Sequence, residues 1–200
     1  MVRNVIFDLG GVVLDWNPDR IVARFQPDAA LQAAFKASVF GHADWKAFDR
    51  GGVTESELIG RLEVRLGLAR TEVIAFLDGT RHSLVQMPDT VKLIRELQRR
   101  SVPLYCLSNM PAEMYLHLQR RHDFWDAFSG IVISGEVKMM KPEPEVFLHL
   151  LDTFGLRADE TVFIDDMAVN VQAARQVGLH AILFRDAAQC REELQLLLTA

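Results

Sequence analysis

VIFDLGG, at residues 5–11, is the stretch that decides the fold of this chain. Its first three residues are apolar and two are β-branched, which predicts a strand buried on both faces, as in a parallel sheet. Asp8 follows where the strand runs out towards Gly10 and Gly11, and ligands of open α/β sheets bind at this carboxyl end of the strands. A carboxylate there has lost much of its water, so we expect it to be paired, metal-bound or reactive. A simple turn aspartate is the alternative interpretation.

Composition excludes several classes of protein. The chain has 200 residues, enough for one core with a small accessory domain, and a net charge of −5. Nucleic acid is not an expected partner, because counterion release needs a concentrated basic surface. No apolar run approaches a membrane span and the N-terminus lacks a signal-peptide pattern, so we expect no membrane partner and a cytoplasmic location. Cys106 is expected to be buried in a strand and Cys190 to be a surface thiol; the oligomeric state stays open.

Apolar runs recur along the second half of the chain and predict further strands. They lie at residues 103–107, 130–134, 161–164 and 180–184. Helical patterns separate them, and three begin at a proline, which suits the first helical position because it has no N–H to leave unpaired. We expect helices to start at Pro88, Pro111 and Pro144 and to cover 168–177 and 191–198. This alternation predicts an α/β fold, a Rossmann-like parallel sheet with helices on both faces.

The segment between the first two predicted strands interrupts this alternation, because it contains helical patterns and no strand candidate. Asp28 and Thr71 are candidate helix caps, and Thr54 with Glu57 forms a capping box ahead of an amphipathic helix. We therefore predict a small all-helical cap domain. The resulting division is a cap at 16–87 and a catalytic core at 1–15 and 88–200.

Polar residues close the later strands at the same edge of the sheet. Ser108 and Asn109, with the N–H groups of the next helix, can hold an anion or simply cap that helix. Asp165 and Asp166 repel each other, and burying both is costly without a cation. Mg²⁺ is the expected ion, since it binds a few carboxylates and keeps several waters; a capping pair is the alternative. Lys141 precedes a rigid turn and can bring one positive charge to the carboxylates and a bound phosphate.

Four motifs thus lie along the chain, at Asp8, Ser108, Lys141 and Asp165–Asp166. In this order they resemble those of the haloacid dehalogenase-like hydrolase superfamily, and the resemblance covers nearly the whole chain. The stretches FDLGGVV at 7–13 and MKPEP at 140–144 look most like its bacterial sugar-phosphate (alpha-D-glucose-1-phosphate) phosphatases and the phosphatase domain of soluble epoxide hydrolases. The resemblance implies a phosphoric monoester hydrolase that depends on Mg²⁺. Its expected substrate is a small phosphorylated metabolite, and a sugar phosphate in particular.

The resemblance also implies roles for individual residues. Asp8 is expected to be the nucleophile and to carry an aspartyl-phosphate intermediate. The implied phosphate-binding groups are Ser108, Asn109, Lys141, Gly10 and Gly11. The implied ligands of Mg²⁺ are Asp8, the Gly10 carbonyl, Asp166 and Asp165, and the sequence does not settle which of the two adjacent aspartates binds directly.

Gly10 departs from the pattern of these phosphatases, which usually carry a second aspartate two residues after the nucleophile to protonate the leaving group. General acid catalysis contributes about two to four powers of ten in rate, so the gap needs an explanation. His42, Asp44 and Asp49 of the predicted cap are candidate replacements. Alternatively, the substrate has a leaving group that needs little help.

Two other functions remain open. One is a 2-haloacid dehalogenase of the same fold, which also lacks the second aspartate because halide leaves without a proton. Such an enzyme has no use for Mg²⁺, so this alternative does not explain the Asp165–Asp166 pair. A binding or regulatory protein that lost efficient turnover is the other alternative, supported by Gly10 alone. Cap residues expected to face the substrate are Trp16, Asn17, Arg20, His42 and Trp45, although Trp45 also suits the core of the cap.

Overall fold

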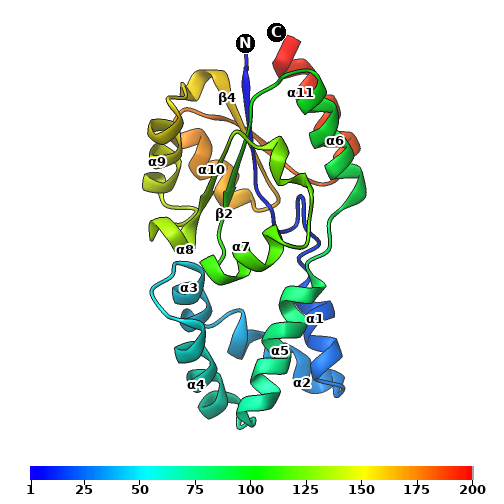
Figure 1. Cartoon of the computed structure of the whole chain (residues 1–200), viewed down its shortest axis with the longest axis vertical. Coiled ribbons are helices and arrows are strands. Elements are labelled where there is room, and N and C mark those ends of the chain that lie inside the picture. Colours follow the sequence, from blue (N-terminus) through cyan, green and yellow to red (C-terminus); the bar gives the residue numbers. More distant parts are fainter. Residues whose placement is uncertain (200) are drawn as a thin grey trace.

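A five-stranded parallel sheet forms one half of the computed structural model, which describes residues 1–199 (Figure 1). The strand order is β3-β2-β1-β4-β5, and every neighbouring pair is parallel. The strands are β1 (Asn4–Phe7), β2 (Leu104–Ser108), β3 (Gly130–Ile133), β4 (Thr161–Asp165) and β5 (His180–Leu183). This order places β1 in the centre of the sheet, and the predicted α/β class is confirmed.

The register of the three central strands brings the predicted site together. Phe7 pairs with Cys106 of β2 on one side and with Ile164 of β4 on the other. The next backbone N–H, that of Asp8, donates to the carbonyl of Ile164 at 2.9 Å. Strands β1, β2 and β4 therefore end at one edge, and the residues that follow them are neighbours.

Helices cover both faces of the sheet. They are α6 (Pro88–Arg99), α7 (Ala112–Gln119), α8 (Ser134–Val137), α9 (Pro144–Phe154), α10 (Ala168–Gln176) and α11 (Ala187–Thr199), with short 3₁₀ turns η1 (Phe124–Ala127) and η2 (Ala158–Glu160). Side chains of α6, α7 and α11 pack in one buried cluster, and those of α9 and α10 pack in a second cluster on the opposite face. Figure 1 shows α9 and α10 on one side of the strands and α6 and α11 on the other.

The last helix corrects two expectations. It begins at Ala187, four residues before the predicted start at Arg191, because Asp186 accepts hydrogen bonds from the first turn. Cys190 was expected on the surface but is fully buried. It lies one turn before the buried Leu194, so both face the sheet, whereas the buried position of Cys106 in β2 was predicted correctly.

A bundle of five helices lies between the first two strands in the chain and beyond the sheet edge in space (Figure 1). The helices are α1 (Pro18–Phe25), α2 (Ala29–Val39), α3 (Ala43–Asp49), α4 (Glu55–Leu66) and α5 (Arg70–Ser83). They enclose a buried cluster of their own, separate from the two clusters on the sheet.

Two of the three predicted helix starts in this bundle are correct. Asp28 accepts a hydrogen bond from Ala30, and Thr54 forms the complete capping box of α4. Thr71 does not cap α5, because that helix begins at Arg70 and the Glu72 carboxylate already accepts the Ala69 N–H at 2.8 Å.

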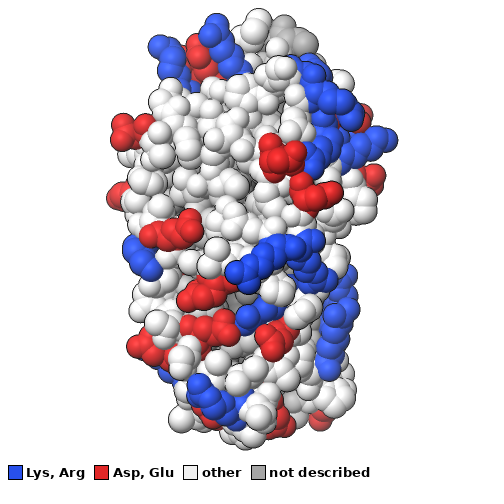
Figure 2. Space-filling model, viewed as in Figure 1, with Lys and Arg blue, Asp and Glu red and all other residues white. Residues whose placement is uncertain are grey.

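The segments that join the bundle to the sheet half run side by side. The N–H of Asp15 donates to the carbonyl of Val85, and that of Met87 donates to the carbonyl of Val13, both at 2.8 Å. Figure 2 shows both acidic and basic side chains on this face, with basic side chains gathered at the upper right and acidic ones beside them. No helix within residues 1–199 has both the length and the apolar character needed to cross a bilayer.

Candidate active site

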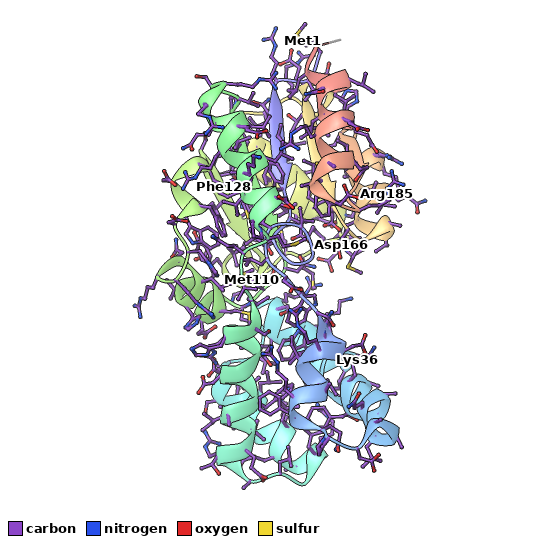
Figure 3. The ribbon with its side chains drawn as sticks, turned by 90° about the vertical axis from the view of Figure 1, so that its right-hand side faces the viewer. Met1, Lys36, Met110, Phe128, Asp166 and Arg185 are labelled. Atoms are coloured by element: carbon purple, nitrogen blue, oxygen red, sulfur yellow. The ribbon has the colours of Figure 1, made fainter. Side chains whose placement is uncertain are left out.

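A cavity of about 390 Å³ lies where the sheet edge meets the helical bundle. Its polar lining residues are Asp8, Gly10, Asp49, Ser108, Asn109, Lys141, Asp166 and Asn170. Its apolar lining residues are Leu14, Trp16, Pro18, Phe40, Trp45, Leu84, Met110, Met114 and Met167. Figure 3 labels Asp166 and Met110, which lie near the junction of the two halves. The cavity thus brings together the sequence-predicted residues from four strand ends and loops.

Asp8 and Lys141 form a buried ion pair at the floor of this cavity. The Lys141 Nζ lies 2.8 Å from the Asp8 Oδ1, and the N–H of Leu9 donates to the same oxygen at 2.7 Å. Both side chains are almost completely buried. Burial raises the pKa of Asp8, Lys141 opposes that effect and Asp165 adds to it, giving a value of about 7. The carboxyl therefore changes charge readily near neutral pH.

Lys141 is held from two directions. Its Nζ donates to the Asp165 Oδ2 at 2.7 Å, and its backbone forms a reciprocal pair with the side-chain amide of Asn109, with two hydrogen bonds of 2.9 Å. Burial alone would lower the pKa of Lys141, but Asp8 and Asp165 together raise it above its usual value. The lysine is therefore charged, and Asn109 uses its side chain to position the lysine backbone.

The adjacent carboxylates Asp165 and Asp166 have different surroundings. Asp165 is fully buried and accepts hydrogen bonds from Lys141, from the Met167 N–H at 2.7 Å and from the Asn170 amide at 3.0 Å. Asp166 is exposed and lines the cavity, and no other residue among 1–199 forms a hydrogen bond or ion pair with its carboxylate. Burial and the neighbouring Asp165 raise the pKa of Asp166. Only the second of these aspartates is free to accept a new partner.

Three carboxylates could hold a cation here. Asp8, Asp165 and Asp166 each offer one oxygen, and these atoms lie within 4.8 Å of one another. One buried lysine compensates part of their charge, and the raised pKa of Asp8 and Asp166 shows that the site favours additional positive charge. Oxygen ligands of this kind suit Mg²⁺.

The two glycines of the first motif have different steric roles. Gly11 has φ +78°, and a Cβ on it would lie 2.3 Å from the Asp166 Oδ2, so the chain passes too close to that carboxylate for a side chain. A Cβ on Gly10 would meet nothing closer than the Trp16 Cβ at 3.4 Å. Position 10 therefore has room for a Cβ, in contrast to position 11.

Residues of the helical bundle divide into those at the cavity and those that support helices. Trp16, Trp45 and Asp49 line the cavity. Asn17 accepts the Arg20 N–H as a helix cap, and the Arg20 side chain pairs with Asp15. His42 and Asp44 are likewise outside the lining. His42 caps α3, and Asp44 forms ion pairs with both Arg61 and Arg65.

Sequence reasoning missed Asn170 and most of the apolar lining. Asn170 lies on the first turn of α10 and donates to Asp165. A polar residue so soon after the aspartates in the sequence was the signal that could have identified it. Phe40, Leu84 and Met114 come from α2's end, a linker and α7, and no motif connects them. Their convergence depends on how the bundle sits over the sheet.

Comparison with known proteins gives the class and the family. The model of the haloacid dehalogenase-like hydrolases matches residues 2–178, and the chain belongs to this family. A sesquiterpene phosphatase of Aspergillus oryzae is 33% identical over 97% of this chain and 96% of its own length. The predicted enzyme class, a haloacid dehalogenase-like hydrolase, is confirmed, and relatives named as phosphatases support its place among the phosphoric monoester hydrolases.

More distant proteins share the fold. A D-ribitol-5-phosphate phosphatase of Bacteroides thetaiotaomicron is 23% identical over the full length of both chains. A haloacid dehalogenase family enzyme from the same organism, solved with magnesium and inorganic phosphate, superposes with a TM-score of 0.76 at 23% identity, covering 92% of this chain and 95% of its own.

Proposed function

We propose that this chain is a Mg²⁺-dependent phosphatase that hydrolyses a small phosphorylated metabolite through an aspartyl-phosphate on Asp8. The observation that carries the proposal is the pairing pattern of the carboxylates. One buried lysine joins Asp8 to Asp165, while Asp166 is left without a partner beside them. Three carboxylates then lie together with one compensating lysine, and a cation between them would offset their mutual repulsion.

Asp8, Asp166 and the Gly10 carbonyl would hold Mg²⁺ in this proposal. Bound there, the ion supplies positive charge that screens the phosphate from the attacking carboxylate. Asp165 fixes the Lys141 ammonium instead of binding the ion, because its oxygens already accept three donors. This answers, as a proposal, which of the two adjacent aspartates binds directly.

Each residue of the site then has its own role in the proposed reaction. The Asp8 carboxylate attacks phosphorus in line, and water hydrolyses the resulting acyl phosphate. Lys141, the Ser108 hydroxyl and the backbone after β2 stabilise the transferring oxygens, since they lie at the end of the same cavity. Gly11 lets the first loop pass close to Asp166.

We further propose that the bundle acts as a cap domain at 16–87 over a core at 1–15 and 88–200. The paired linkers at Asp15–Val85 and Val13–Met87 give it a narrow connection to the core. Side chains of the cap form the outer wall of the cavity, so closure would exclude water and select the substrate.

A screen of phosphate monoesters, each with and without Mg²⁺, tests the proposal. Turnover that needs Mg²⁺ and is lost in Asp8→Asn is the expected result. Release of halide from 2-haloacids that chelation leaves unchanged would instead establish the dehalogenase alternative. A sugar phosphate is one candidate substrate, supported by the ribitol-phosphate phosphatase relative, and a terpenyl phosphate is a second, supported by the fungal relative.

A further inference from the structure

The lining of the cavity is strongly asymmetric. Its polar groups gather at the floor formed by the sheet edge, where the phosphate is proposed to bind. The remaining wall consists mostly of aromatic, Leu, Met and Pro side chains from the bundle, the linkers, α7 and the loops that follow β2 and β4. Within the described residues, Asp49 is the single charged side chain that the bundle contributes to this wall.

Three aromatic rings make the bundle's wall rigid. Phe40 packs edge-on against Trp45 with ring centroids 4.6 Å apart and against Trp16 at 5.2 Å. The two indole rings are stacked at 6.3 Å. Rings that pack on each other in this way keep their positions and present carbon surface to the cavity.

This wall discriminates between polar and apolar organic groups. A buried hydroxyl left without a hydrogen-bond partner costs about 1–3 kcal/mol, and a polyol would bring several of them against this wall. A buried methylene gains about 0.8 kcal/mol, which is about fourfold in affinity. The cavity volume of about 390 Å³ is ample for a chain of many carbons.

We infer that the organic part of the substrate is an apolar alkyl or prenyl chain and not a sugar. The inference rests on the proposed phosphatase function. The phosphate end binds at the polar floor, and the chain lies against Trp16, Phe40, Trp45, Leu84 and Met114.

Binding to the Asp8→Asn variant tests this substrate class without any turnover. Calorimetry would compare alkyl phosphates from ethyl to octyl with ribitol 5-phosphate and glucose 1-phosphate. We expect Kd to fall about two- to fourfold with each added methylene and to be weakest for the polyol and sugar esters. A Kd that does not depend on chain length, or tighter binding of the sugar esters, overturns the inference.

A matched pair of variants places the chain on the wall. Met114→Gln brings an amide to the lining at nearly constant size, and we expect it to weaken octyl phosphate about tenfold. Leu116→Gln on the exposed side of the same helix is the control and should leave that affinity unchanged. Equal effects of the two variants would contradict the proposed position. Absence of turnover of every ester by the wild type would overturn the phosphatase function, while these affinities still decide the substrate class.

A different observation concerns Asp49, at the end of α3. The bundle is joined to the core here: the Ser134 hydroxyl donates to the Asp49 carbonyl and the Lys138 Nζ donates to the Gly51 carbonyl, both at 2.6 Å. These contacts fix the backbone that carries the Asp49 side chain into the cavity.

The Asp49 carboxyl is unpaired. No side chain among residues 1–199 forms a hydrogen bond or ion pair with it, because Arg50 binds Glu143 and Lys138 binds carbonyl groups. Burial raises the pKa of Asp49 well above its usual value, which favours the protonated form of the group. The other two candidate acids of the bundle are outside the cavity and engaged in capping or ion pairs.

The structure assigns to Asp49 the proton transfer that Gly10 cannot perform. As the bond from the Asp8 carboxylate to phosphorus forms, the bond to the leaving oxygen breaks and that oxygen takes the Asp49 proton. In the second step, water attacks phosphorus and passes a proton to the Asp49 carboxylate, which restores Asp49, frees Asp8 and releases inorganic phosphate.

Leaving-group dependence tests this role. With an alkyl phosphate, whose alkoxide is strongly basic, we expect Asp49→Asn to lower kcat by about a hundred- to ten-thousand-fold. With p-nitrophenyl phosphate, whose leaving group needs no proton, the loss should stay below about tenfold. Asp49→Glu should recover part of the alkyl activity. Equal losses on both esters would show a structural role and overturn the assignment, whereas a wild type inactive on both would overturn the phosphatase function itself.

Discussion

Replacing Lys141 by methionine removes the one positive charge between Asp8 and Asp165. The Nζ lies 2.8 and 2.7 Å from their oxygens, and at an effective dielectric constant of about 20 each contact amounts to about 6 kcal/mol of Coulomb energy. Much of this offsets the desolvation of three buried groups. Removal of one partner from a buried pair costs about 3–5 kcal/mol, and we expect the free energy of unfolding to fall by that amount at pH 8.

The loss should depend on pH in a defined direction. Without Lys141, the influences left on Asp8 are burial, Asp165 and Asp166, which all raise its pKa further above the ordinary carboxyl value of 3.8. A group whose pKa is raised in the folded state favours folding when protonated, so the variant loses stability as pH rises from the ordinary value through the folded one. At pH 5 Asp8 is protonated in the folded variant, and the destabilisation should be much smaller.

Urea unfolding of metal-free protein at pH 5 and pH 8 measures both quantities. Lys138→Met is the matched control, because Lys138 donates to two carbonyl groups and its removal leaves no buried carboxylate without a partner. The control should change stability equally at both pH values. A Lys141→Met variant that is as stable as wild type at pH 8, or equally destabilised at both pH values, would refute the reasoning about the buried ion pair.

Three further expectations follow from the same geometry. Gly11→Ala should lower the free energy of unfolding by at least about 1 kcal/mol in urea melts, because of its positive φ and the approach of Asp166, while Gly10→Ala should be nearly neutral. Asp44→Asn should cost about 1 kcal/mol at pH 7 and progressively less as pH falls below the ordinary carboxyl value of 3.8 in the same assay, since two arginines lower the pKa of Asp44. Mg²⁺ should raise Tm more at pH 8 than at pH 6, because protons compete for Asp8 and Asp166, whose pKa values are raised; an equal shift would contradict this.

Most of the sheet and the floor of the site could be predicted from the sequence. The strands are short apolar runs bounded by clear turns, and parallel strands must end at one edge, so Asp8, Ser108 and Asp165 were placed together by topology alone. Lys141 was predicted at this edge because it precedes a rigid turn that can direct its ammonium towards the carboxylates. These inferences depend on local patterns and on a general rule of α/β folds.

Features that depend on tertiary packing could not be predicted in this way. The exposure of Cys190 was misjudged because the start of α11 depends on a cap at Asp186 that the helical pattern did not reveal. The different surroundings of Asp165 and Asp166 depend on Asn170, which approaches only after α10 has packed. Which cap acid faces the cavity depends on the docking of the bundle, and three candidates were equal until the structure separated them.

In the proposed mechanism Asp8 carries the phosphoryl group during turnover. Acid quenching of the wild-type enzyme during steady turnover, followed by proteolysis and mass spectrometry, measures this directly. We predict one phosphoryl group on Asp8 when Mg²⁺ is present, and none after chelation of the metal or in Asp8→Asn. Steady release of inorganic phosphate with Asp8 never phosphorylated, or with the phosphoryl group on another residue, would contradict it.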